Sequence, residues 1–302
     1  MAKVVAFGDW HGNTPCAIQA MKHALTYHPD AHLIQVGDFG FWDTDIRDRN
    51  GNLRGFVAKI NDFLEENNAK LHVMLGNHEN YWAIPSVYGY KALYNSDTDH
   101  IDGIFSKPLP EINKSITSKM YILGDELDDD NAYKYMHMTI EGYLTSELFP
   151  NILLIPRGFV WNIDGTTYAS LGGGGSIDIC ARLRGRGWWE EEAVSREQVD
   201  RFEAMVKNYQ HPEVDVMFVH DLPRSVVEEM TRTWQPLNLP SDVKAYTDSV
   251  QHNIEDAVRR INPKLLVGGH MHTRYSGKMD NGTQVEVLHR DGAPVRKTYL
   301  AI

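Results

Sequence analysis

Five short apolar runs, each followed closely by Asp, Asn or His, constrain the fold of this sequence more than any other feature. They are residues 3–7, 32–36, 71–75, 214–219 and 264–267. Short apolar, β-branched runs indicate buried strands, and open α/β sheets build their sites at the carboxyl ends of strands. A hydrophobic core does not need polar residues at these points. We therefore expect the five strand ends to meet in one site.

The residues delivered by these strand ends are Asp9, His11, Asp38, Asn77, His78, His220, His270 and His272. Taken singly, each stretch has an ordinary explanation. Gly76-Asn77-His78-Glu79 is a plausible turn, and His11 is a plausible surface or capping residue. His270 and His272 lie two residues apart, so in a strand they point to the same side. It is the recurrence of the pattern that favours a functional site.

Length and composition limit the classes of protein to which this chain can belong. The 302 residues are 42% hydrophobic and carry a net charge of -11. We expect one domain over residues 1–302, with an insertion at 81–150 that borders the site. The acidic balance argues against duplex nucleic acid as a partner. Cys16 and Cys180 lack metal-type spacing, and no apolar stretch is long enough to cross a membrane. We therefore expect a cytoplasmic protein; its oligomeric state is left open.

Strand–helix alternation predicts the architecture. Helices are expected from Asn13 or Thr14 onward, around residues 56–64, and at 196–209 and 250–261. Such repeats form parallel sheets. Shorter strands at 152–171 and 273–302 contain the hairpin signals Asp164-Gly165 and Asn281-Gly282. Together they suggest helices packed outside two central sheets.

The ordered set Asp9-x-His11, Gly37-Asp38, Gly76-Asn77-His78-Glu79, His220 and Gly269-His270-x-His272 resembles the calcineurin-like metallophosphoesterase family. The resemblance runs from Phe7 to His272. It implies an α/β fold: a four-layer α-β-β-α sandwich with two mixed sheets and an insertion near the active site. Gly-Gly-x-x-Ser-Ile-Asp at 172–178, with Arg and Trp-Trp downstream, resembles a bacterial and phage subgroup.

The family pattern implies two divalent metal ions about 3.5–4 Å apart, bridged by Asp38. Asp9, His11, Asp38 and His272 would hold the first ion, and Asp38, Asn77, His220 and His270 the second. This His-rich set suits Mn²⁺, Fe or Zn²⁺ better than Mg²⁺ or Ca²⁺, and we expect Mn²⁺. A hydroxide bridging the ions would be the nucleophile.

His78 resembles the family's non-ligand histidine, whose implied role is to contact the phosphate and protonate the leaving group. A carboxylate is expected to orient its ring. Asp38, Asp9 and Glu79 are the nearest candidates in sequence, and the sequence does not choose among them.

The substrate expectation rests on a departure from protein Ser/Thr phosphatases, which carry Asp-Arg-Gly shortly after the second Asp. Here Phe39-Gly40-Phe41-Trp42 follows Asp38. Phe39 and Trp42 would stack on a base; hydrophobic packing beneath the loop is the ordinary explanation for such a cluster. Arg182 and Arg186 would contact phosphate.

We therefore predict a phosphodiesterase acting on small nucleotides, cyclic ones first. The alternatives are a phosphomonoesterase acting on nucleotides or proteins, and a non-catalytic scaffold on the same fold. The scaffold is disfavoured because every ligand position is filled.

Overall fold

The computed structural model of the chain describes residues 3–92, 144–209, 211–232 and 238–302. Within them, strands and helices alternate through both halves of the chain. The predicted insertion at 81–150 lies mostly outside these residues. Its described ends form the short helix α3 (Ala83–Ser86) and the paired strands β4 (Lys91–Ala92) and β5 (Leu144–Thr145), which extend one edge of the first sheet.

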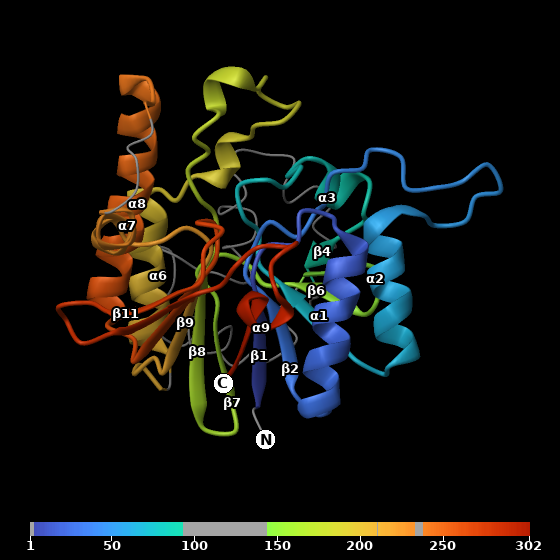
Figure 1. Cartoon of the computed structure of the whole chain (residues 1–302), viewed down its shortest axis with the longest axis horizontal. Helices are drawn as coiled ribbons and strands as arrows, with labels where there is room; N and C mark the ends of the chain where they lie inside the picture. The colour runs from blue at the N-terminus through green and yellow to red at the C-terminus, as the bar shows by residue number, and fades with distance from the viewer. Residues whose placement is uncertain (1–2, 93–143, 210, 233–237) are drawn as a thin grey trace.

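Two mixed sheets form the centre of the molecule (Figure 1). The first has the strand order β13-β1-β2-β3-β6-β5-β4. Its remaining strands are β1 (Val4–Phe7), β2 (His32–Gln35), β3 (Leu71–Val73), β6 (Ile152–Leu154) and β13 (Tyr299–Ala301). Strands β1, β2, β3 and β6 run parallel, and β13 joins β1 antiparallel.

The second sheet has the order β11-β12-β10-β9-β8-β7. Its strands are β7 (Val160–Ile163), β8 (Thr166–Leu171), β9 (Val216–Val219), β10 (Leu265–Gly268), β11 (Tyr275–Lys278) and β12 (Gln284–Val287). Both predicted hairpins are present. Asp164 and Gly165 turn between β7 and β8 with positive φ, and Gly282 does so between β11 and β12.

Helices cover the outer faces of the two sheets (Figure 1). The first sheet carries α1 (Thr14–Tyr27) and α2 (Gly55–Glu66), while α6 (Arg196–Asn208), α7 (Arg224–Thr231) and α8 (Ser241–Ile261) cover the second. Short helical turns are η3 (Ile179–Ala181), η4 (Glu190–Glu192) and α9 (Val295–Thr298). This four-layer order is the one that the family resemblance implies, so the predicted fold is confirmed.

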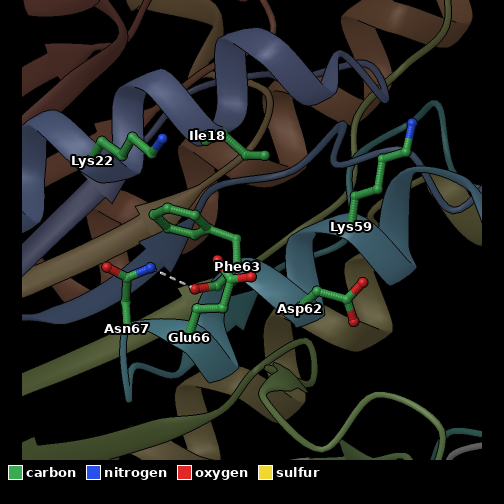
Figure 2. A pocket seen from close by; sticks show the side chains of 7 residues that line it. All are labelled: Ile18, Lys22, Lys59, Asp62, Phe63, Glu66 and Asn67. Carbon is green, nitrogen blue, oxygen red and sulfur yellow. Dashed lines mark hydrogen bonds between the residues drawn. The ribbon is translucent and has the colours of Figure 1, made fainter.

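Helix boundaries follow local sequence chemistry. Asn13 caps α1 through the backbone N–H of Cys16, and Pro15 occupies the first turn, where its missing N–H costs nothing. Ser195 and Gln198 form a capping box at the start of α6. Figure 2 shows the groove between α1 and α2, where the Asn67 amide donates to the Phe63 carbonyl at the end of α2.

Buried side chains form one core between the sheets and beneath α1 and α2, and a second beneath α6, α7 and α8. Between the sheets, the rings of Trp161, Tyr168 and Phe218 stack across β7, β8 and β9. No described helix is both long enough and apolar enough to cross a bilayer. The rigid two-sheet centre fixes where the strand ends lie.

Candidate metal centre and active site

The predicted site residues follow the carboxyl ends of five strands drawn from both sheets. Asp9 and His11 follow β1, Asp38 follows β2, and Asn77 and His78 follow β3; His220 follows β9, and His270 and His272 follow β10. Contacts link these residues across the two sheets. For example, His270 donates its backbone N–H to the Asp9 carboxylate at 3.0 Å. The strand ends therefore meet, as the sequence pattern predicts.

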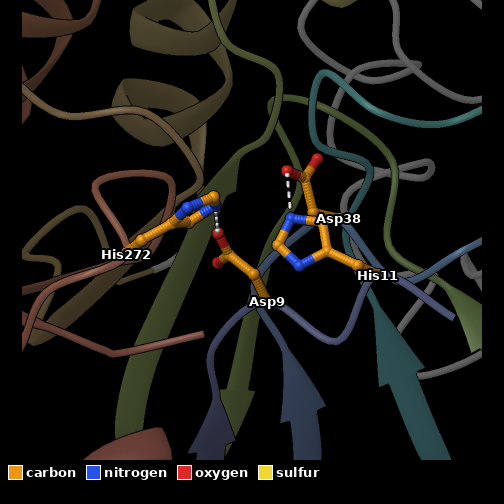
Figure 3. Close-up of side chains that lie close together, drawn as sticks. All are labelled: Asp9, His11, Asp38 and His272. Carbon is orange, nitrogen blue, oxygen red and sulfur yellow. Dashed lines mark ion pairs between the residues drawn. The ribbon is translucent and has the colours of Figure 1, made fainter. Parts of the chain in front are cut away.

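Four of these side chains form a first cluster (Figure 3). One ligand-type atom from each of Asp9, His11, Asp38 and His272 lies within 4.8 Å of the others. Nε2 of His11 lies 3.4 Å from Oδ2 of Asp38, and Nε2 of His272 lies 3.3 Å from Oδ2 of Asp9. Both carboxylates are fully buried.

A second cluster shares Asp38 with the first and adds His220 and His270, again within 4.8 Å. The Asn77 amide oxygen lies 2.9 Å from Nε2 of His220 and 2.9 Å from Nδ1 of His270. Oδ1 of Asp38 faces His220 at 3.2 Å, whereas Oδ2 faces His11. The two oxygens of one carboxylate are thus divided between the clusters, as a bridging ligand requires.

The donor set fits a pair of bound cations. Oδ2 of Asp38 is buried and has no hydrogen-bond partner among the described residues, which is costly for a charged oxygen. Glycine allows the carboxylates to approach the backbone. A Cβ at Gly76 would meet Oδ1 of Asp38, and one at Gly269 would meet Oδ1 of Asp9.

The pKa values of two histidines also favour bound cations. Burial works to lower the pKa of His220, but Asp38 and Asp9 raise it to about 10. Burial likewise opposes protonation of His11, yet its contact with Asp38 and the charges of Asp38 and Asp9 raise its pKa to about 9. The carboxylates thus create a strongly negative field, and this field attracts protons or metal ions alike.

Hydrogen bonds on the outer side of two rings determine which nitrogen faces the clusters. Nδ1 of His220 lies 3.0 Å from the Val36 carbonyl oxygen, and Nδ1 of His11 lies 2.9 Å from Oδ1 of Asp291. Both oxygens only accept, so each Nδ1 carries a hydrogen and each Nε2 faces Asp38, where a bound cation would take the place of the second proton. Asp291 also accepts from the Asn13 amide at 2.7 Å.

Four candidate ligands have left-handed backbone: His11, Asp38, His270 and His272, with φ of 43°, 54°, 63° and 51°. Residues other than glycine rarely adopt this conformation, and Asn or Asp tolerate it best. Non-glycine residues in this region often mark functional sites. Here the unusual turns aim side chains from the loops after β1, β2 and β10 into one small volume.

His78 lies beside the clusters, and its backbone N–H donates to Oδ1 of Asp38 at 2.9 Å. The sequence predicts a carboxylate against its ring, but the hydrogen-bond partner that the described residues give the ring is the Arg182 guanidinium, 2.9 Å from Nδ1 and 3.5 Å from Nε2. Glu79 instead accepts the N–H groups of Phe39 and Gly76 and ties their two loops together. The pKa of His78 is lowered to about 4, mainly by burial. The charge of Asp38 works to raise this pKa, and the charge of Arg182 lowers it further.

A pocket of about 350 Å³ adjoins His78. Its lining includes Trp42, Thr44, Asn80, Arg182, Arg186 and Trp189. The Trp42 side chain is 44% exposed, so its ring can meet a ligand. Phe39 is fully buried against Trp10 and Phe56, so the expectation that it stacks on substrate is wrong. Packing beneath the loop accounts for it.

The sequence profile of the calcineurin-like phosphoesterases matches residues 2–274, and the chain therefore belongs to this family. Comparison with curated proteins found no significant match.

Several solved structures align with most of this chain at low sequence identity. The phosphopantetheinyl hydrolase of Mycobacterium tuberculosis is 12% identical, with 99% of this chain and 95% of that chain covered and a TM-score of 0.47. TT1561 of Thermus thermophilus is 12% identical, with 96% and 90% covered and a TM-score of 0.43. A 5′-nucleotidase from Candida albicans is 13% identical, with 98% and 50% covered and a TM-score of 0.35.

Proposed function

We propose that this metallophosphoesterase uses two metal ions to hydrolyse phosphodiester bonds of small nucleotides, cyclic nucleotides included. The observation that carries the two-ion part is the division of Asp38, with Oδ1 facing His220 and Oδ2 facing His11. Asp9, His11, Asp38 and His272 would hold one ion, and Asp38, Asn77, His220 and His270 the other. A ligand set with four histidines favours Mn²⁺, Fe or Zn²⁺.

When bound, the ions would supply an activated water and neutralise phosphoryl charge. The remaining chemistry falls to side chains around the pocket. Arg182 is a permanent donor against Nδ1 of His78, so the neutral ring carries its hydrogen on Nε2. From Nε2 the neutral His78 ring would stabilise the charge developing on the leaving oxygen by a hydrogen bond. Full proton transfer, the general-acid role that the sequence predicts, would require the doubly protonated ring.

The diester preference rests on the pocket and on charge. At about 350 Å³ the pocket is within the usual range for small-molecule sites, and Trp42 offers a partly exposed face for a base. A diester carries one negative charge, which two divalent ions would largely neutralise. The ester group of the diester that does not face the metal ions would lie in this pocket, between Trp42 and Arg186.

A phosphomonoesterase is the second candidate, and Arg182 is the observation that favours it. A monoester carries nearly two negative charges at neutral pH, so it benefits from a further cation. The Arg182 guanidinium lies beside His78 and lines the same pocket. It therefore offers the cationic contact to phosphate that residues 39–42 do not provide.

A substrate panel with Mn²⁺ would decide between the two. We expect higher kcat/KM on 2′,3′- or 3′,5′-cyclic nucleotides and bis-nitrophenyl phosphate than on nucleoside monophosphates or nitrophenyl phosphate. Faster turnover of monoesters, with that advantage lost in Arg182→Gln, would establish the second candidate instead. Metal content is measured in parallel. Protein that binds two ions but turns over none of these substrates would contradict both.

A further inference from the structure

The glycine-rich segment after β8 passes directly behind Asn77. A Cβ at Gly174 would lie 3.3 Å from the His220 ring and 3.5 Å from the Asn77 amide oxygen, so the backbone lies against the second cluster. Two residues on, the buried Ser176 hydroxyl accepts a hydrogen bond from Nδ2 of Asn77 at 3.0 Å. The same hydroxyl donates to Oε2 of Glu192 at 2.8 Å.

Glu192 is fully buried and receives further donors. The backbone N–H of Ser176 donates to its Oε1 at 2.9 Å, and the Tyr246 hydroxyl, on α8, donates to Oε1 at 2.8 Å. As a carboxylate Glu192 can only accept, so the Ser176 hydroxyl hydrogen must point toward it. The lone pairs of Ser176 are then available to Asn77.

This chain of hydrogen bonds determines which way the Asn77 amide faces. An amide rotated by 180° would present N–H groups to His220 and His270, and an N–H group has no lone pair for a metal ion. Because Ser176 accepts from Nδ2, Oδ1 is directed at the two histidines. A neutral ligand has no net charge to orient it in the field of the site, so it depends on such a partner.

We propose that Ser176 and Glu192 are positioning residues that hold the Asn77 oxygen toward the second cluster and thereby set the affinity of the second metal ion. Tyr246 anchors Glu192 to α8 and contributes through it. The proposal rests on the two-ion function proposed above. It assigns a role to Ser176 of the glycine-rich segment and to one member of the acidic triplet at 190–192.

The test is a Mn²⁺ titration of metal-free protein, followed by calorimetry and by electron paramagnetic resonance, which distinguishes single ions from coupled pairs. It is run at pH 8, above the pKa of about 7 to which burial raises Glu192 despite its donors. We expect Ser176→Ala to keep the first ion at wild-type affinity and to bind the second roughly 10–100-fold more weakly. Glu192→Gln should weaken the same ion, and Tyr246→Phe should do so to a smaller degree.

Glu191→Gln is the matched control, because it changes the same functional group one residue away. Glu191 accepts from the Trp82 indole and has no contact with Ser176 among the described hydrogen bonds. This variant should titrate like wild type. Unchanged second-ion affinity in Ser176→Ala, or equal weakening of both ions, overturns the proposal.

If Ser176→Ala does not fold, Tyr246→Phe carries the test, since it removes only a hydroxyl. A selective loss at the second ion supports the proposal, and wild-type binding of both ions overturns it. Wild-type protein that binds fewer than two ions would instead contradict the two-ion function itself.

Discussion

The guanidinium of Arg182 lies 2.9 Å from Nδ1 of His78, although 104 residues separate the two in the sequence. Arg182 is itself held by the Asp178 carboxylate, which accepts from Nε at 2.7 Å, and by the Gly187 carbonyl at 2.9 Å. A carboxylate in this position would stabilise a protonated ring. A guanidinium instead favours the neutral ring, and because Nη2 of Arg182 is closer to Nδ1 than to Nε2, at 2.9 Å against 3.5 Å, the hydrogen belongs on Nε2.

Replacing Arg182 by Lys should lower kcat/KM on nucleotide substrates by roughly 10-fold or more while both metal ions stay bound. A lysine keeps the charge but lacks the planar fork that contacts Asp178 and His78 together. Steady-state kinetics with metal analysis would measure this. Arg184→Lys is the control, because Arg184 pairs with Glu190 on the exposed surface. Equal kcat/KM for the two variants would show that Arg182 has no role in the reaction.

His78→Gln should retain the metals and lose roughly 10²–10⁴ in rate on substrates with poor leaving groups. The reason is that a departing alkoxide is stabilised by the hydrogen bond from Nε2, whereas nitrophenolate leaves without such help. The loss on bis-nitrophenyl phosphate should therefore be much smaller. Rates on both substrate types, with metal content, would measure the difference. Equal losses on both, or loss of an ion, would reject a role for His78 at the leaving group.

Asp291→Ala should weaken the first metal ion by roughly 10–100-fold and leave the second near its wild-type affinity. Without the carboxylate, Nδ1 of His11 loses the acceptor that keeps Nε2 turned toward Asp38. A Mn²⁺ titration would resolve the two ions. Asp280→Ala, on the exposed β11–β12 turn, controls for loss of an acidic group. Weakening of the second ion alone would contradict this role.

His72→Gln should make the protein less sensitive to mild acid. Burial lowers the pKa of His72 to about 4, against about 6.5 in an unfolded chain. Between pH 4 and pH 6.5 the His72 imidazole binds a proton in the unfolded state but not in the folded state. Its contribution to the unfolding free energy is therefore complete above pH 6.5 and is lost as the pH falls toward 4. From pH 7 to pH 5 this single group contributes a loss of about 2 kcal/mol.

Urea unfolding of metal-free protein at the two pH values would measure that loss. The drop in unfolding free energy should be smaller in His72→Gln than in wild type by about that amount. His252→Gln, on the exposed face of α8, is the control and should retain the wild-type drop. Identical pH dependence in wild type and His72→Gln would show that His72 is protonated without cost in the folded state.

Much of the fold and of the two clusters follows from the sequence because parallel strands impose geometry. Once 3–7, 32–36 and 71–75 are adjacent parallel strands, the residues after them must meet at one edge. Asp9 and Asp38 do so in the first cluster, and Asn77 contacts the histidines of the second. The hairpin at 164–165 is equally local, since Asp-Gly accommodates the positive φ that the turn needs.

The residues that support the clusters could not be predicted in this way. Asp291 reaches His11 from a loop 280 residues away, and no periodicity links the two. Glu192 belongs to an acidic triplet that looks solvent-exposed in sequence, yet it is buried because Ser176 and Tyr246 supply its hydrogen bonds. For Phe39 the sequence predicts exposure where the structure shows burial. An aromatic residue next to a metal ligand suggests stacking on substrate, but the loop after β2 turns its ring into the core.

The left-handed backbone at His11, Asp38, His270 and His272 has an evolutionary consequence. Each such residue costs of the order of 1 kcal/mol or more relative to glycine, so glycine at any of the four would relax the turn and delete a candidate ligand at the same time. A lineage that no longer needed the chemistry would reveal itself first by glycines at these four positions, with the sheets behind them unchanged.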